Sequence, residues 1–275
     1  VDLVGGAAGP STFALCDESG KVVVLDAATG GVERELSLGG PIKSCTVQDD
    51  GLAASTPQPA PPLSQQISVA LLNRDSEMVT GQRLLLRELA TLEDETVTKT
   101  LVDLASNPLT APLLIADART ALAARRTGAS HMLAALAKHY DFLHDVLLSP
   151  PVGPMAQALA AMKEKAAAPL LASHLLDPAD TDDDVKQAAA ALVDLGGPNE
   201  VPALKQFFKL YRAYPDSEGV AAAVVSSGQA LLAFGGADGR KIVDAALADP
   251  FTVDALKSRL KAVEEQADAQ KTQKK

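Results

Sequence analysis

The chain has 275 residues, of which 47% are hydrophobic, so it can bury a sizeable core and cannot be disordered along its whole length. Its net charge of −10 disfavours binding to a phosphate backbone, because the basic residues do not cluster strongly. No apolar run reaches the length of a membrane-spanning helix and no signal-type segment opens the chain, so we expect a soluble protein.

The first 56 residues contain short β-branched runs separated by glycines, a pattern typical of strands. We expect four strands, at Phe13–Cys16, Lys21–Asp26, Val32–Leu38 and Ile42–Val47. Their spacing of about ten residues predicts an antiparallel meander.

The turn after the second of these strands has a recognisable pattern, Leu-Asp-Ala-Ala-Thr-Gly, over residues 25–30. We expect Asp26 and Thr29 to bond the turn backbone and Gly30 to adopt a positive φ, so that the next strand folds back. The segment resembles one blade of the pyrroloquinoline-quinone (PQQ)-like β-propellers, although the usual Trp after the turn is missing.

This resemblance implies a propeller that is incomplete within the given chain. One blade cannot bury enough apolar area by itself, so we expect a missing N-terminal portion or sheets supplied by another subunit. The alternative is a small self-contained β-cap.

A proline-rich linker at residues 57–62 separates this β-module (residues 1–56) from an Ala- and Leu-rich region with helical periodicity. We predict a helical repeat domain over residues 63–267 and a polar tail over residues 268–275. The expected helices are residues 65–73, 76–91, 94–106, 112–126, 129–147, 152–164, 167–176, 182–195, 199–213, 217–234, 238–248 and 252–267.

Four stretches of the helical region superimpose on one another around anchor leucines roughly 33 to 39 residues apart. These anchors are Leu122, Leu159, Leu192 and Leu231. The pattern around Asp184–Gly196, followed by Val201-Pro202-Ala203-Leu204, resembles the short bacterial form of the HEAT repeat. We therefore expect a mainly α protein: a HEAT-like α-solenoid with an N-terminal antiparallel β-module that resembles part of a β-propeller.

Two clusters of side chains could hold a metal ion. His131, His139 and His144 share one predicted helix, but their spacing does not match the i and i+4 pattern of a two-histidine site. The acidic run Asp177, Asp180 and Asp182–Asp184 suggests calcium, yet it lacks the EF-hand pattern, and carboxylates at a helix start stabilise free backbone N–H groups without any ion. We predict no metal site.

Arg119, Arg125 and Arg126 form a small basic spot that we interpret as a solvated face. No nucleophile and base pair is recognisable, and the Gly-rich segments lack the context of a phosphate loop. We predict no catalytic residues and no cofactor, and we expect that the protein is not an enzyme.

Cys16 and Cys45 are the only cysteines and fall in predicted strands of the β-module. A disulfide between them fits an exported protein, and two buried thiols fit a reducing cytosol. The sequence leaves both open.

The combination predicts a non-enzymatic scaffold or assembly subunit that binds other protein subunits, without nucleic acid, in a complex of the bacterial envelope or periplasm. A bacterial cytoplasm is the alternative compartment. The alternative function, implied by the resemblance because short HEAT proteins include bilin lyases, is an enzyme or accessory subunit of the bilin-lyase or quinoprotein type.

Overall fold

The computed structural model describes residues 3–8, 12–26, 28–37, 44–48, 51–55, 63–73, 75–138 and 150–273. The chain divides into two compact units, Val1–Pro62 and Leu63–Lys275, which we call the β unit and the helical unit. The predicted linker at residues 57–62 lies outside the described residues.

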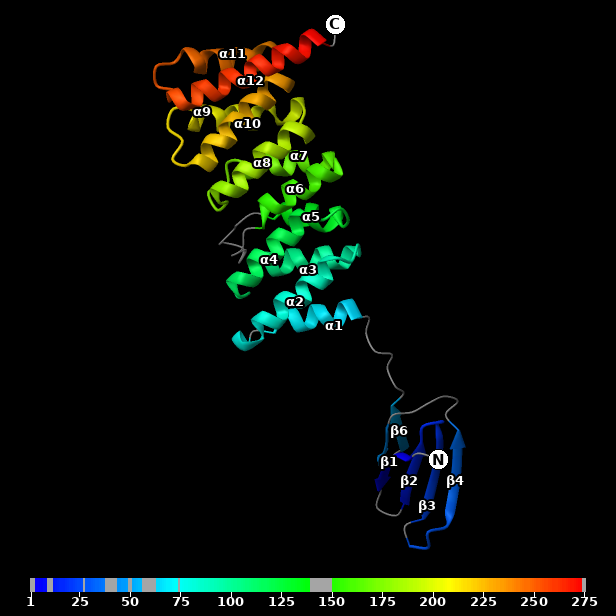
Figure 1. Cartoon of the computed structure of the whole chain (residues 1–275). Coiled ribbons are helices and arrows are strands. Elements are labelled where there is room, and N and C mark those ends of the chain that lie inside the picture. Colours follow the sequence, from blue (N-terminus) through cyan, green and yellow to red (C-terminus); the bar gives the residue numbers. More distant parts are fainter. Residues whose placement is uncertain are drawn as a thin grey trace. The chain divides into compact units, whose positions relative to one another are not determined.

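The β unit contains two antiparallel sheets (Figure 1). Four strands form a meander in chain order, β1 (Leu3–Ala8), β2 (Thr12–Asp17), β3 (Lys21–Asp26) and β4 (Val32–Ser37). The second sheet is a hairpin of β5 (Ser44–Gln48) and β6 (Gly51–Ser55), and β5 packs against β1 and β2. The antiparallel module is confirmed. Strands β1 and β6 are additional to the four expected ones, and their Gly- and Ala-rich sequences carry little strand signal.

Two Asp-centred turns set the register of the meander. Asp26 Oδ1 accepts hydrogen bonds from the Thr29 backbone N–H and hydroxyl, both at 2.7 Å, and Gly30 has a φ of +69°. Asp17 Oδ1 likewise accepts the Lys21 N–H at 3.0 Å, and Gly20 has a φ of +86°. The predicted chemistry of the turn at Asp26 is confirmed, and these turns align Val22 with Leu36 across β3 and β4.

The helical unit is a HEAT-like α-solenoid. Its α-helices are α1 (Leu63–Leu71), α2 (Val79–Ala90), α3 (Glu95–Ser106), α4 (Pro112–Ala123), α5 (Ala129–Leu136), α6 (Val152–Met162), α7 (Ala168–His174), α8 (Asp182–Leu195), α9 (Val201–Tyr211), α10 (Glu218–Phe234), α11 (Gly236–Ala248) and α12 (Asp254–Gln273). Short 3-10 turns precede three of them, η1 (Ser76–Met78), η3 (Lys165–Ala167) and η4 (Pro198–Glu200). None of the described helices is both long enough and apolar enough to cross a membrane.

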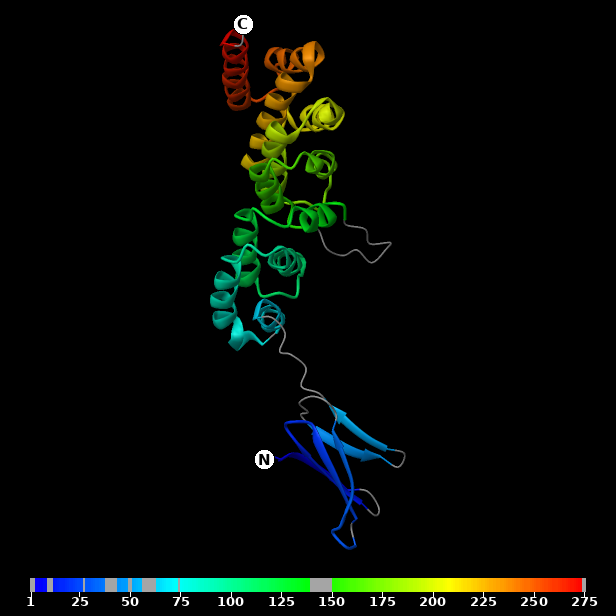
Figure 2. The same ribbon diagram turned by 90° about the vertical axis from the view of Figure 1, so that its right-hand side faces the viewer.

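The helices form two rows that run along the unit (Figure 2). Even-numbered helices contact one another in the order α2, α4, α6, α8, α10 and α12, and odd-numbered helices contact one another from α1 to α11. Each repeat therefore buries its apolar face against the next one, and one continuous core runs from Leu71 to Leu260.

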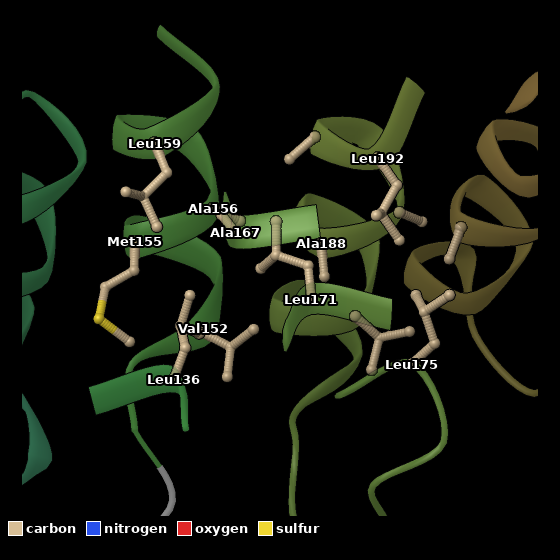
Figure 3. Close-up of a cluster of buried hydrophobic side chains, with 14 of the residues drawn as sticks. Leu136, Val152, Met155, Ala156, Leu159, Ala167, Leu171, Leu175, Ala188 and Leu192 are labelled. Carbon is tan, nitrogen blue, oxygen red and sulfur yellow. The ribbon is translucent and has the colours of Figure 1, made fainter. Parts of the chain in front are cut away.

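The predicted repeat is visible in this core. The four anchor leucines lie in α4, α6, α8 and α10, all in the even row, and each is fully buried. Figure 3 shows how Leu159 and Leu192 point into the space between successive repeats, where small residues such as Ala156 and Ala188 let the helices approach closely.

The prediction that the basic residues form a solvated face is wrong for Arg125, which is only 5% exposed. Its guanidinium donates to the carbonyl oxygens of Leu92 (2.6 Å) and Asp94 (2.8 Å) and to the hydroxyls of Thr98 (2.9 Å) and Thr127 (2.8 Å). Burial lowers the pKa of Arg125, and the nearby Glu93 and Asp94 carboxylates oppose that shift. Arg125 therefore joins the α2–α3 and α4–α5 connections, while Arg126 is exposed.

The last helix is longer than predicted, because α12 continues to Gln273 and does not end at residue 267. Arg240 of α11 donates to Glu264 at 2.9 Å and forms a two-pronged ion pair with Asp268. This interaction fixes Asp268 to the neighbouring helix and extends the ordered helix beyond the point where apolar periodicity ends.

Candidate functional site

One edge of the helical unit is formed by the loops that precede the even-numbered helices (Figure 1). We call this the loop edge; its described loops are residues 72–73 with 75–78, 107–111, 175–181, 212–217 and 249–253. Neighbouring loops are in contact: a cavity of about 160 Å³ lies between the first two, and Arg212 pairs with Asp249 at 2.6 Å across the last two.

Three of these loops use the same turn, in which an Asx side chain precedes a proline. The Asx oxygen accepts a backbone N–H two residues later, in the pairs Asn107 with Leu109 (3.0 Å), Asp177 with Ala179 (2.9 Å) and Asp249 with Phe251 (2.9 Å). This hydrogen bond fixes the backbone at the donating residue, and in two of the turns the side chain of that residue, Leu109 or Phe251, is exposed. The residue after the proline therefore occupies an equivalent position in each of these three loops.

Large apolar side chains occupy exposed positions along the loop edge. Phe251 and Tyr214 are each 80% exposed and Leu109 is 62% exposed, and Leu72 and Met78 are also exposed. The chain has only 9 Phe and Tyr residues in total and no Trp. Two of these 9 aromatic side chains are therefore largely exposed to solvent on the loop edge, where they contribute little to the core.

A groove of about 360 Å³ lies between the α9–α10 loop and the start of α12. We call it the C-terminal groove. Its apolar floor includes Ala221 and Leu256, and its polar wall includes Asp216, Glu218 and Arg259. Tyr214 and Phe251 lie one and two residues outside its lining residues Pro215 and Val253 in the chain.

A buried ionic cluster lies farther along the loop edge, between α5 and α8. His174 is fully buried at the end of α7, and its Nε2 lies 2.9 Å from the Leu136 carbonyl oxygen while its Nδ1 lies 2.8 Å from Asp180 Oδ2. Asp177 Oδ2 is 3.9 Å from the same Nδ1. Because a carbonyl and a carboxylate both accept hydrogen bonds, the geometry favours the imidazolium form, which donates from both nitrogens.

The electrostatics of the cluster point the same way. Burial opposes the charge of His174, but the hydrogen bonds to Asp180 and Leu136 and the attraction of the two aspartates outweigh it and raise the pKa of His174 above its usual value. The cluster is therefore a buried ion pair that links the end of α5 to the α7–α8 loop, and we call it the charged lock.

The same three side chains have the composition of a metal site. Among the described residues, one ligand atom from each of His174, Asp177 and Asp180 lies within 4.8 Å of the others. The hydrogen bonds to Leu136 and Asp180 already account for both ring nitrogens of His174, so the donor set is explained by an ion pair without a metal.

The acidic run considered for calcium is divided among separate partners. Asp184 accepts from Thr181 (2.8 Å), from the Gly153 N–H (2.7 Å) and from Arg119, and thereby joins α8 to α6 and α4. Thr181 caps α8, with its hydroxyl accepting the Asp184 N–H. Asp177 and Asp180 instead face His174, so the run does not converge on one point.

Of the predicted histidines, His131 lies half-buried on α5, whereas His139 and His144 lie outside the described residues. Sequence reasoning missed His174, Tyr214 and Phe251. The available signal was the recurrence of Asx-Pro at residues 107–108, 177–178 and 249–250, which marks equivalent turns as well as helix ends.

Cys16 is fully buried in β2 and is disulfide-bonded. Nothing is described of the Cys45 side chain in β5, so the Cys16–Cys45 pair stays a prediction. The described core of the β unit around Cys16 is small and consists of Ala14 and Val22 with Val24 and Leu36 packed against them.

No protein-family model matches the chain, and no curated protein matches it. A solved structure of the complex of CpcE and CpcF of phycocyanin lyase from Nostoc sp. PCC7120 aligns with 76% of this chain and 97% of its own, at 14% identity and a TM-score of 0.29.

Two expectations are corrected at this point. The expectation that the protein is not an enzyme is corrected, because the solved structure that the chain matches is described as a phycocyanin lyase and a missing catalytic motif does not exclude an enzyme. The PQQ-like propeller blade is not supported, since neither a family model nor a structural match supplies one.

Proposed function

We propose that this chain is a protein-binding subunit of a larger complex and that it holds a partner protein along its loop edge. The observation that carries the proposal is the exposure of Leu109, Tyr214 and Phe251 beside hydrogen-bonded turns. Because the backbone at Leu109 and Phe251 is already fixed, covering these side chains costs little ordering entropy. Aromatic residues in such places are enriched in protein interfaces and often contribute most of the binding free energy.

The architecture suits this role. Each repeat of a solenoid contacts only its neighbours, so the loops of successive repeats form an extended surface on a stiff support. The exposed residues occur in the first, second and last pairs of helices, at Leu72, Leu109 and Phe251, which matches an elongated contact rather than a single pocket.

The experiment is affinity purification of the tagged full chain from its source cells, with the mass of the intact complex measured by native mass spectrometry. A variant with Leu109→Ser, Tyr214→Ser and Phe251→Ser should lose a partner that the unchanged chain retains. The matched control, Val69→Ser with Leu84→Ser and Leu92→Ser, removes three other exposed apolar side chains of the helical unit that lie outside the loop edge and should keep the partner. A chain that purifies alone at 28.4 kDa, or a loop-edge variant that keeps every partner, contradicts the proposal.

The match to a phycocyanin lyase makes an enzyme or accessory subunit of the bilin-lyase type the second candidate. The same purified material separates it from the first, because a bound bilin or quinone absorbs visible light. A coloured complex whose colour is lost in the loop-edge variant would assign the edge to a chromophore-handling complex.

We also propose the bacterial cell envelope as the compartment, with the bacterial cytoplasm as the alternative. The disulfide at Cys16 supports the envelope, since structural disulfides persist in oxidising compartments and are rare in the cytosol of mesophiles. Cell fractionation tests this assignment.

A further inference from the structure

We propose that the C-terminal groove binds a cationic amphipathic segment of the partner, one that carries lysine or arginine beside large apolar side chains. The inference rests on the proposed function and adds the place of contact and the chemistry of the partner. Three observations lead to it: a rigid frame, an apolar rim and an excess of carboxylates.

The frame of the groove is fixed by polar contacts. Arg212, at the end of α9, pairs with Asp249 at 2.6 Å and donates to the Thr252 hydroxyl at 3.0 Å. The hydrogen bond from the Phe251 N–H and the contact with Arg212 hold the pKa of Asp249 below its usual value. Thr252 is buried and directly follows Phe251 in the chain. The exposed phenyl ring of Phe251 therefore lies on a loop whose backbone is held in place by hydrogen bonds and by the Arg212–Asp249 ion pair.

Exposed apolar side chains at or within two residues of the groove's lining residues in the chain form what we call its rim. Phe251 and Tyr214 are the most exposed of them, and the lining residue Val253 is also exposed. The equivalent position in the α7–α8 loop is Ala179, which shows that the turn does not itself require a large side chain. The aromatic ring at Phe251 is therefore available for a contact outside this chain.

The charge around the groove is mainly negative. Asp216 and Glu218 lie in its wall, and Asp254 is fully exposed at the start of α12. Two cations oppose these three carboxylates: Arg259 pairs with Glu218 at 2.8 Å, and Lys257 lies 4.0 Å from Asp254, so the exposed Asp216 carries the surplus negative charge. The surplus favours a cationic occupant.

The same charges weigh against other occupants. A second copy of this chain would bring another net charge of −10 to the contact, and a nucleic acid or an anionic lipid surface would bring phosphate groups to exposed carboxylates. The chain's own C-terminal residues 270–275 are rich in lysine but contain no apolar side chain that would cover Tyr214 and Phe251. A segment that combines both properties is the occupant that fits.

The test uses the full chain and a fluorescein-labelled amphipathic peptide of about 18 residues with Leu on one helical face and Lys on the other. Two peptides of the same length serve as references, one with Glu in place of Lys and one with Ser in place of Leu. We expect the Lys/Leu peptide to bind in fluorescence anisotropy at least tenfold more tightly than either reference. Equal binding of the Glu/Leu peptide, or no binding of the Lys/Leu peptide, overturns the proposal.

Matched variants locate the binding. The pair Tyr214→Ala and Phe251→Ala should weaken binding of the Lys/Leu peptide at least tenfold, whereas Leu109→Ala, in the equivalent turn of another repeat, should leave it unchanged. Asp216→Asn with Glu218→Gln should weaken binding more than Asp75→Asn with Glu77→Gln, an exposed acidic pair at the other end of the loop edge. Equal losses within either comparison would show general attraction to an acidic protein and would overturn the assignment.

Because the chain contains no Trp, Phe251→Trp gives a single reporter. Its emission should shift to shorter wavelength when the Lys/Leu peptide covers it, and that of Leu109→Trp should not. In the source cells, a complex that survives Tyr214→Ala with Phe251→Ala but is lost in the triple loop-edge variant would reject the groove while keeping the proposed function.

Discussion

The β unit and the helical unit reach their folds by different means. In the helical unit, one continuous core of leucine and alanine side chains passes from repeat to repeat. In the described part of the β unit, the buried core is limited to Ala14, Cys16 and Val22, and the meander depends on Asp-centred turns and on the disulfide at Cys16. Burial is the main stabilising contribution that the described side chains show in the first unit, whereas turn hydrogen bonds and a disulfide are the main ones that they show in the second.

The comparison also explains where function can be placed. A continuous core makes the helical unit stiff enough to hold exposed side chains such as Phe251 on its loops, because the energy comes from the interior. The described core of the β unit is smaller, so the loss of one turn hydrogen bond or of the disulfide should destabilise the whole unit.

The largest expected effect is a cavity in the helical core. Leu192→Ala removes a fully buried side chain from between α8 and its neighbours and should lower the free energy of unfolding of the helical unit by about 2 to 5 kcal/mol. Thermal unfolding followed by helical circular dichroism measures it. An equal loss of the β unit's amide signals in NMR would show that the two units unfold together and would break the comparison.

Removal of the disulfide should act on the other unit. Cys16→Ser should cost the β unit about 2 to 4 kcal/mol, because the unfolded chain regains the freedom of a closed loop. Amide exchange of strands β2 and β3 measures the loss, and non-reduced peptide mapping identifies the bonded partner that we expect to be Cys45. A shift of the helical transition of similar size would contradict the separation of the two units.

Arg125 tests whether apolar burial alone holds the repeats. Arg125→Lys keeps the charge but cannot reproduce a planar fork of donors to Leu92, Asp94 and Thr98, and should destabilise the helical unit by about 2 kcal/mol. The control is Arg126→Lys, at an exposed neighbour, which should change the melting temperature little. Equal effects of the two variants would show that the buried hydrogen bonds of Arg125 do not contribute to the stability of the helical unit.

The smallest effect is a pH dependence confined to the helical unit. The raised pKa of His174 means that the folded state holds its proton more tightly than the unfolded state. Its stabilisation is fully present below the ordinary histidine pKa of about 6.5 and is lost as the pH rises through the folded value.

His174→Gln should therefore cost about 1 to 2 kcal/mol at low pH and less at high pH, because Gln keeps a hydrogen bond but not the charge. Melting temperatures of both proteins across pH 5 to 9 give the difference. A gap that is constant over this range would show that folding leaves the pKa of His174 unchanged, and a gap that grows with pH would show that the fold holds His174 neutral.

Much of the fold could be predicted from the sequence because its signals are local. Leucine spacing placed Leu122, Leu159, Leu192 and Leu231 in the core, and the Asp26 turn was predicted down to the positive φ of Gly30. Less of the candidate site could be predicted. The Asx-Pro dipeptides indicated helix ends, but they did not show that the residue after the proline is half-buried at Ala179 and exposed at Phe251. The sequence around Arg125 likewise did not show that this side chain would be buried.

What the sequence determined by itself is therefore the periodic part: helices, their caps and the residues that face the core, since hydrophobic period and turn chemistry act between near neighbours in the chain. The tertiary structure alone decided which distant groups meet. His174 became a charged lock only because Leu136 and Asp180 converge on it, and α12 extends past its apolar stripe because Arg240 holds Asp268. The loops at Arg212 and Asp249 became one frame for the same reason, because side chains remote in sequence were brought within hydrogen-bond reach by the stacking of repeats.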